Sequence, residues 1–170
     1  MAKVVLEPAR RDQKQVIANL IQLYTHDFSE HWTGGPNGEL GEEGLFEPYD
    51  YLDAYWTEPG RVPLLVRVDG RLAGFVLVND HAHSGRAVDR NVAEFFIVRK
   101  HRRGGVGTTA AHAVFDLYPG TWEAAVVRRN MPALAFWRRA VSAHPKVSDI
   151  EEMDVAGPDW NGPILRFRIA

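Results

Sequence analysis

The spacing of apolar residues along the chain alternates between a strand-like and a helix-like period. Residues 3–6 form a short apolar run typical of a strand, and residues 12–24 carry apolar side chains at roughly helical spacing. Residues 33–38 are rich in glycine and predict a flexible loop, and residues 49–56 indicate a short helix rich in aromatic side chains. The first part of the chain therefore predicts a strand, a helix, a loop and a short helix.

The middle of the chain carries the pattern of a β-hairpin followed by a buried strand. Two apolar runs, residues 64–68 and 72–78, are joined by an Asp-Gly pair, which is a strong hairpin signal. Residues 92–98 are apolar on both alternating faces, which predicts a central strand covered on both sides. Only Glu94 interrupts this run.

The last part of the chain alternates helix and strand patterns. Helical spacing recurs over residues 105–117 and 131–141, and strand patterns cover residues 122–127, 147–155 and 164–169. The complete order predicts an α/β (α+β) fold, with a mixed sheet that is antiparallel in its middle and flanked by helices.

Composition narrows the class of protein. The chain has 170 residues and 19.1 kDa, with 45% hydrophobic and 25% charged residues, so we expect one globular domain over residues 1–170. The absence of Cys excludes disulfides, thiolate metal sites and a Cys nucleophile. No apolar leader or stretch of membrane-spanning length occurs, so we expect a soluble, cytoplasmic protein that does not contact membranes.

Charge is distributed unevenly along the chain. Residues 1–60 hold 11 Asp/Glu against 4 Lys/Arg, whereas residues 98–140 hold 8 Lys/Arg against 2 Asp/Glu. The first segment should favour cations and the second anions, unless both are simply solvated faces. Binding to nucleic acid is disfavoured, because the pI is about 6.4 and the first third is acidic.

A glycine-rich segment, residues 102–109, follows the buried strand and begins a helix. Its glycines allow close backbone approach, and free amides at a helix start favour a diphosphate. An exposed glycine turn with a basic rim is the simpler alternative. Residues 105–110 also satisfy a dinucleotide fingerprint, but hairpin-like strands precede it instead of βαβ units. A P-loop is excluded, because no Lys-Ser/Thr pair follows the glycines.

Two motifs resemble the GCN5-related N-acetyltransferases (GNAT). Arg102, Gly105 and Gly107 match that family's motif A, R/Q-x-x-G-x-G/A, and residues 130–137 match its motif B, N-x-x-A-x-x-F-Y, up to the last residue. Trp137 stands where the family often has Tyr, and Arg99 stands where it often has Pro.

The resemblance implies acetyl-CoA as co-substrate. Backbone amides of residues 103–108 would hold the pyrophosphate, the peptide groups of residues 96–98 would pair with the pantetheine arm, and residues of motif B would line the other side. The cofactor-binding residues implied in this way are Phe96, Ile97, Val98, Arg102, Arg103, Gly104, Gly105, Val106, Gly107, Thr108, Asn130, Ala133, Phe136 and Trp137.

Glu94 is the candidate catalytic residue. A carboxylate inside an apolar strand is costly unless it is paired or faces a cleft, and burial would raise its pKa toward the range of a general base. A structural pair with an Arg is the alternative. His81 and His83 are the only histidines with a metal-like spacing, but a polar loop favours solvent exposure for them, and we expect no metal.

The resemblance implies an N-acetyltransferase that moves the acetyl group directly to an amine, with the oxyanion held by a backbone amide near Ile97. A non-catalytic acyl-CoA sensor is the alternative, favoured by the missing Tyr. We expect the acceptor to be a small-molecule or peptide amine. Residues 26–58 combine acidic and aromatic side chains, which could bind a cationic amine. The alternative is that this segment is a solvated surface with a partly buried aromatic core. The sequence is compatible with a monomer or a homodimer.

Overall fold

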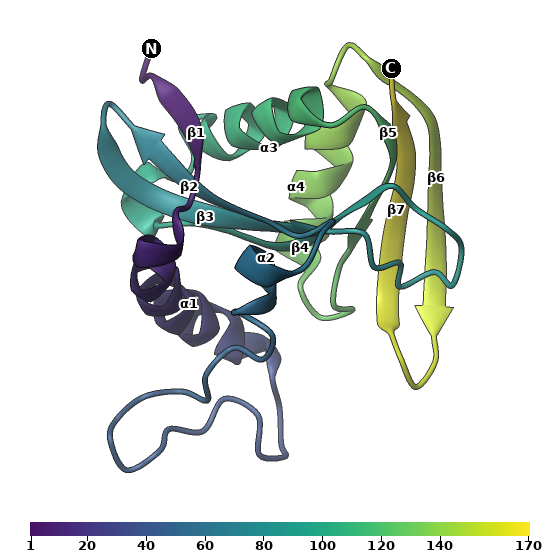
Figure 1. Ribbon diagram of the computed structural model, residues 1–170. Coiled ribbons are helices and arrows are strands. Elements are labelled where there is room, and N and C mark those ends of the chain that lie inside the picture. Colours follow the sequence, from purple (N-terminus) through teal and green to yellow (C-terminus); the bar gives the residue numbers. More distant parts are fainter.

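Seven strands form one sheet in the order β1-β2-β3-β4-β5-β7-β6 in a computed structural model that describes residues 1–170 (Figure 1). The strands are β1 (Val4–Pro8), β2 (Val62–Val68), β3 (Arg71–Asn79), β4 (Arg90–Ile97), β5 (Gly120–Ala125), β6 (Val147–Ala156) and β7 (Asn161–Ile169). The helices are α1 (Lys14–Phe28), α2 (Ala54–Thr57), α3 (Val106–Leu117) and α4 (Met131–Ser142). The element order agrees with the order expected from the sequence.

The predicted mixed sheet is confirmed. All neighbouring strands are antiparallel except β4 and β5, which are parallel. Asp69 and Gly70 join β2 to β3 with φ angles of 49° and 78°, as a two-residue turn of type I′ requires. Strand β4 lies in the middle of the sheet, as its apolar pattern predicts.

The helices cover the two faces of the sheet and create two hydrophobic clusters. Helices α1 and α2 pack on one face through Ile17, Leu20 and Tyr55, which contact the side chains of β2 to β4. Helices α3 and α4 pack on the other face, in a larger cluster that includes Trp122 and Phe115. None of the helices combines the length and the apolar composition needed to cross a bilayer.

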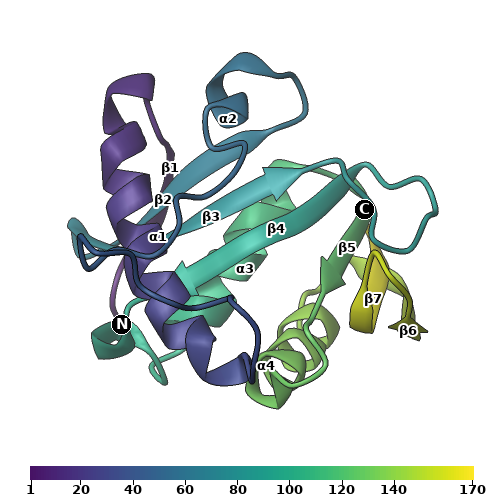
Figure 2. The ribbon, with the colours of Figure 1, turned by 90° about the horizontal axis from the view of Figure 1, so that it is seen from below.

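Strands β4 and β5 separate soon after they meet. They pair only at Arg90 with Trp122 and at Asn91 with Glu123, although β4 continues to Ile97. Figure 2 shows the two strands diverging, with α4 below the opening. The side of β4 that faces β5 is therefore left without a strand partner beyond Asn91.

A buried ion pair lies where the two strands part. Glu123 is fully buried and receives a hydrogen bond of 2.7 Å from Nη1 of Arg166 on β7. Its carboxylate also accepts hydrogen bonds from the hydroxyl of Ser84 and from the backbone N–H of His83. This network fixes the loop between β3 and β4 to the central sheet.

The sequence prediction was less accurate between α1 and β2. Of the helix expected over residues 49–56, only α2 is formed, because Tyr51 has a left-handed φ of 64° that a helix does not allow. Helix α1 continues to Phe28, beyond the expected end at residue 24. Strand β5 ends at Ala125, two residues before the expected end.

We predict that Glu123→Ala lowers the free energy of unfolding by roughly 3–5 kcal/mol, because it leaves the largely buried guanidinium of Arg166 without its carboxylate partner. Glu7→Ala is the matched control, since Glu7 pairs with Arg67 where both side chains are partly exposed, and it should cost about 0–1 kcal/mol. Urea unfolding of both variants measures the difference. Equal losses would show that the buried network does not stabilise the sheet.

Candidate functional site

A cavity of about 560 Å³ lies at the opening between β4 and the α3–α4 side of the sheet. We call it the basic cleft, because Arg99, Arg102, Arg103 and Arg139 line it. It brings together both segments that carry the sequence motifs. The predicted residues that line it are Phe96, Ile97, Arg102, Arg103, Gly105, Gly107, Thr108, Asn130, Ala133, Phe136 and Trp137.

Three predicted residues do not line the cleft. The backbone N–H of Val98 donates to Ala73 O at 2.8 Å, so this amide is used by β3. Val106 turns its side chain into the core. Gly104 is exposed, with open space where a Cβ would stand.

The start of α3 presents free backbone amides to the cleft. Gly105 is the N-cap with a left-handed φ of 79°, and no side chain caps the helix. The first amides of a helix have no intrahelical acceptor, and together with the helix dipole they favour an anion. Gly107 has a different role, because a Cβ there would lie 3.2 Å from Cε2 of Phe136, so its missing side chain allows α3 to approach α4.

The arginines of the basic cleft are not equivalent. Arg102 donates from Nε to Ile97 O at 2.6 Å and pairs with Asp27 on α1, and Arg99 reaches the same carboxylate at 2.8 Å. Burial raises the pKa of Asp27, but the hydrogen bonds from both guanidiniums outweigh it, so the pKa lies below its usual value. Arg103 and Arg139 form no ion pair. Arg139 was not singled out from the sequence, and only the basic balance of its segment signals it.

The residues of the second motif hold α4 in place as well as lining the cleft. The Asn130 side chain accepts a hydrogen bond of 3.2 Å from Ala133 N and thereby caps α4. Trp137 is 7% exposed and packs against Phe95 and Phe136, with ring centroids 5.1 and 4.9 Å away. It lines both the basic cleft and the next cavity.

A second cavity of about 390 Å³ adjoins the basic cleft, and we call it the inner cavity. Both cavities share Tyr24, Phe28, Phe95, Asn130, Ala133 and Trp137 in their walls. The inner cavity is mostly apolar, and Glu94 is its only carboxylate. No Lys or Arg lines it.

Burial raises the pKa of Glu94 to about 7, while hydrogen bonding by Tyr24 and Tyr49 opposes the rise. The pKa values of both phenols are raised in turn, first by their own burial and then by the charge of Glu94. Glu94 has no cationic partner, so the alternative of a structural pair with an Arg is not observed. A carboxylic acid with this pKa can exchange a proton near neutral pH.

His81 and His83 differ in their surroundings. His81 is exposed as expected, but His83 is half-buried in the wall of the inner cavity, with its ring 4.4 Å from that of Trp160. Burial lowers the pKa of His83, and the nearby His81 lowers it further. No three His, Asp or Glu side chains gather where they could hold a metal ion.

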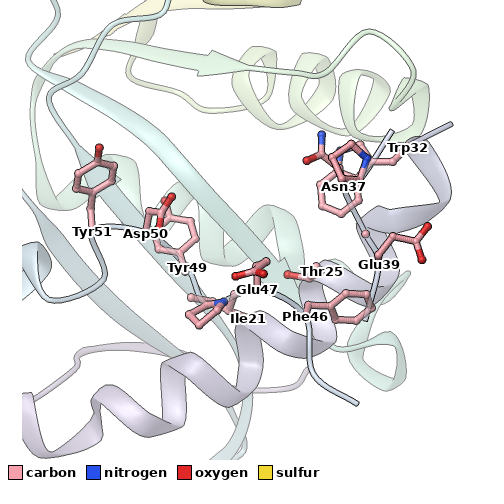
Figure 3. Close-up of a pocket in the computed structure, with 13 residues that line it drawn as sticks. Ile21, Thr25, Trp32, Asn37, Glu39, Phe46, Glu47, Tyr49, Asp50 and Tyr51 are labelled. Atoms are coloured by element: carbon pink, nitrogen blue, oxygen red, sulfur yellow. The ribbon is translucent and has the colours of Figure 1, made fainter. Parts of the chain in front are cut away.

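A third cavity of about 380 Å³, which we call the vestibule, adjoins the inner cavity, and Figure 3 shows the residues that line it. The two share Ile21, Thr25, Trp32 and Tyr49. The vestibule lies within the acidic and aromatic segment noted in the sequence. It is lined by Ile21, Thr25, Trp32, Pro36, Asn37, Gly38, Glu39, Phe46, Glu47, Pro48, Tyr49, Asp50 and Tyr51.

Solved structures of acetyltransferases share this fold. An acetyltransferase from Thermus thermophilus superposes with a TM-score of 0.68 at 16% identity, covering 99% of this chain and 97% of the other. The aminoglycoside acetyltransferase AAC(6')-Ib, in complex with coenzyme A and kanamycin, gives 0.65 at 13% identity, covering 98% and 95%. Spermidine N-acetyltransferase from Vibrio cholerae, in complex with CoA and spermine, gives 0.57 at 15% identity, covering 98% and 94%.

At the level of sequence, no curated protein matches the chain. The family model described as the acetyltransferase (GNAT) family matches residues 17–141. This range is most of the chain and contains most of α1, Glu94 and both walls of the basic cleft. The chain therefore belongs to the acetyltransferase (GNAT) family.

Proposed function

We propose that the protein transfers an acetyl group from acetyl-CoA directly to a primary amine. The observation that carries this proposal is Glu94, a carboxylate with a pKa of about 7 in an apolar cavity that joins the basic cleft. A group that titrates near neutral pH is suited to act as a general base. Membership of the acetyltransferase family supports the same reaction.

The basic cleft fits acetyl-CoA. Its uncapped helix start and the unpaired guanidiniums of Arg103 and Arg139 suit phosphate groups, and the β4 edge beyond Asn91 offers backbone partners for an extended amide-containing arm. Arg102 has a different role, since it is held by Asp27 and Ile97 O and positions the turn. Structures of AAC(6')-Ib contain coenzyme A, which supports this assignment.

When bound, acetyl-CoA supplies the acetyl group as a thioester. Glu94 accepts a proton from the ammonium of the acceptor, directly or through water, which makes the amine nucleophilic. The apolar wall of the inner cavity excludes bulk water, and a backbone amide near Ile97 stabilises the developing oxyanion. Trp137 cannot act as a general acid, because an indole N–H can donate a hydrogen bond but is far too weak an acid to give up its proton. The thiolate that leaves when the C–S bond breaks is protonated from solvent.

A non-catalytic sensor that binds acyl-CoA would need no base beside the cleft. Glu94 has hydrogen bonds from two phenols but no cationic partner, so the cost of keeping its charge among mostly apolar residues favours a catalyst. A screen of amines with acetyl-CoA between about pH 6 and 10, read by release of free thiol, tests the proposal across the range in which Glu94 and the amine change protonation. Tight binding of acetyl-CoA without transfer to any amine would favour the sensor.

The double variant Arg103→Gln/Arg139→Gln should raise the Kd of CoA roughly 3- to 30-fold, because two partly screened charge pairs with phosphate are lost. Lys100→Gln is the control, since Lys100 is exposed in the same basic segment but does not line the cleft. Calorimetry at two salt concentrations measures the Kd of CoA for both variants and its dependence on salt. An unchanged Kd in the double variant would place the phosphates elsewhere.

Glu94→Gln should lower kcat/KM by roughly 10²- to 10⁴-fold near pH 8, the usual contribution of a general base. The loss should shrink near pH 10, where the amine is already neutral, and below about pH 6, where Glu94 is protonated in the wild type.

Tyr24→Phe removes a hydrogen bond that lowers the Glu94 pKa, so the midpoint at which kcat/KM rises with pH should shift to a higher pH. Tyr118→Phe, outside both cavities, should not move it.

Stability gives a second readout of the same carboxyl group. The folded pKa of about 7 exceeds the ordinary Glu value of 4.5, so stability is lost as the pH rises through this interval. Glu94→Gln should therefore increase the free energy of unfolding near pH 8 and leave it unchanged near pH 4. An equal effect at both pH values would contradict a raised pKa.

A further inference from the structure

The vestibule gives the amine site a second compartment with its own charge. Glu39, Glu47 and Asp50 line it and form no ion pair, and no Lys, Arg or His side chain lines it. In Figure 3, Glu47 and Asp50 lie beside Tyr49, one of the residues that both compartments share. Acidic side chains around one concavity focus a negative potential that attracts cations.

Aromatic rings line the vestibule together with these acids. Trp32, Phe46, Tyr49 and Tyr51 contribute to its wall, and the face of such rings attracts ammonium groups. Tyr51 is 76% exposed and has a φ of 64°, a strained backbone conformation for a large side chain. The ring therefore stays at the rim of the vestibule instead of packing into the core.

The loop that forms the vestibule is held by contacts to two other elements and by one contact within the loop. Gln22 on α1 binds both backbone groups of Phe46, with distances of 3.0 and 2.8 Å. Gly38 lies against Trp32 so closely that a Cβ would stand 2.7 Å from its Cε3. The side chain of Arg129, next to α4, hydrogen-bonds to the Thr33 hydroxyl. A vestibule held in this way loses little conformational entropy when it binds a ligand.

The inner cavity supplies the independent second observation. It is apolar except for the unpaired Glu94 and a few uncharged polar groups, so it has room for one ammonium group and for a hydrocarbon chain, but no further carboxylate for another cation. The carboxylates of the adjoining vestibule form no ion pair, whereas in the basic cleft Asp27 is paired with Arg99 and Arg102 and Glu30 contacts His31. A ligand with an ammonium group at each end and a hydrocarbon chain between them would match Glu94, the apolar wall and the vestibule carboxylates.

We propose that the acceptor is a small-molecule diamine or polyamine, whose reacting amine enters the inner cavity while a second ammonium group stays in the vestibule. The placement of the reacting end rests on the proposed function. Acids and aromatic rings of the vestibule bind the second ammonium, and the apolar wall of the inner cavity receives the chain between the two nitrogens. The two adjoining cavities, of about 380 and 390 Å³, suit a small molecule.

The test compares straight-chain α,ω-diamines of four to ten carbons with the monoamine of equal carbon number. Calorimetry in the presence of CoA measures binding, and thiol release with acetyl-CoA measures transfer. We expect the best diamine to bind roughly tenfold or more tightly than its monoamine and to show a similar advantage in kcat/KM. The double variant Glu47→Gln/Asp50→Asn should remove most of this advantage, because it weakens the binding of the diamine much more than that of the monoamine.

The control is Glu42→Gln/Glu43→Gln, which removes the same charge from the same loop outside the vestibule and should keep the preference. Diamines that bind no more tightly than monoamines, or a preference that survives in the vestibule variant, would overturn the inference. Its failure is separable from that of the proposed function. Diamine binding without transfer to any amine would overturn only the proposed function, whereas transfer without a diamine preference would overturn only this inference.

Discussion

The separation of β4 from β5 is the constraint on which the rest of the structure depends. Two parallel strands can part only where each is held from its other side, and here β3 pairs along β4 while β7 pairs along all of β5. The last pair before the opening, Asn91 with Glu123, contains the carboxylate that Arg166 holds from β7. The buried ion pair therefore lies at the point of divergence, and the basic cleft and the inner cavity lie beyond it.

Three compartments of different charge surround this opening because different elements contribute to each. The start of α3 and the side of α4 make the cleft basic, β4 places one carboxylate in an apolar cavity, and the segment after α1 makes the vestibule acidic. Asp27 links α1 to the turn before α3, because its carboxylate forms ion pairs with Arg99 and Arg102. Charges that serve the architecture are paired, and those of Arg103, Arg139 and Glu94 face the cavities without ionic partners.

The sequence predicted what depends on local pattern. Periodicity indicated the element order, and the two family motifs identified segments that meet at the cleft although a strand and a helix separate them. What it missed depends on contacts between distant residues. Nothing near Arg102 indicates that Asp27, 75 residues earlier, holds it, and the helix expected over residues 49–56 fails at one left-handed residue. Glu123 interrupts an apolar strand just as Glu94 does, yet only its partner on β7 makes it structural.

The cost of desolvating a charge explains why an acidic vestibule would help an amine to reach an apolar reaction site. Desolvation raises the pKa of Glu94 to about 7, and it would equally oppose the entry of an ammonium group. In the proposed reaction, carboxylates in the wetter vestibule attract the cation before it loses its water. The ionised Glu94, which is poorly solvated among apolar side chains, is then neutralised by a proton taken from the amine. The acidic vestibule would thus attract the cation, and Glu94 in the apolar inner cavity would accept its proton.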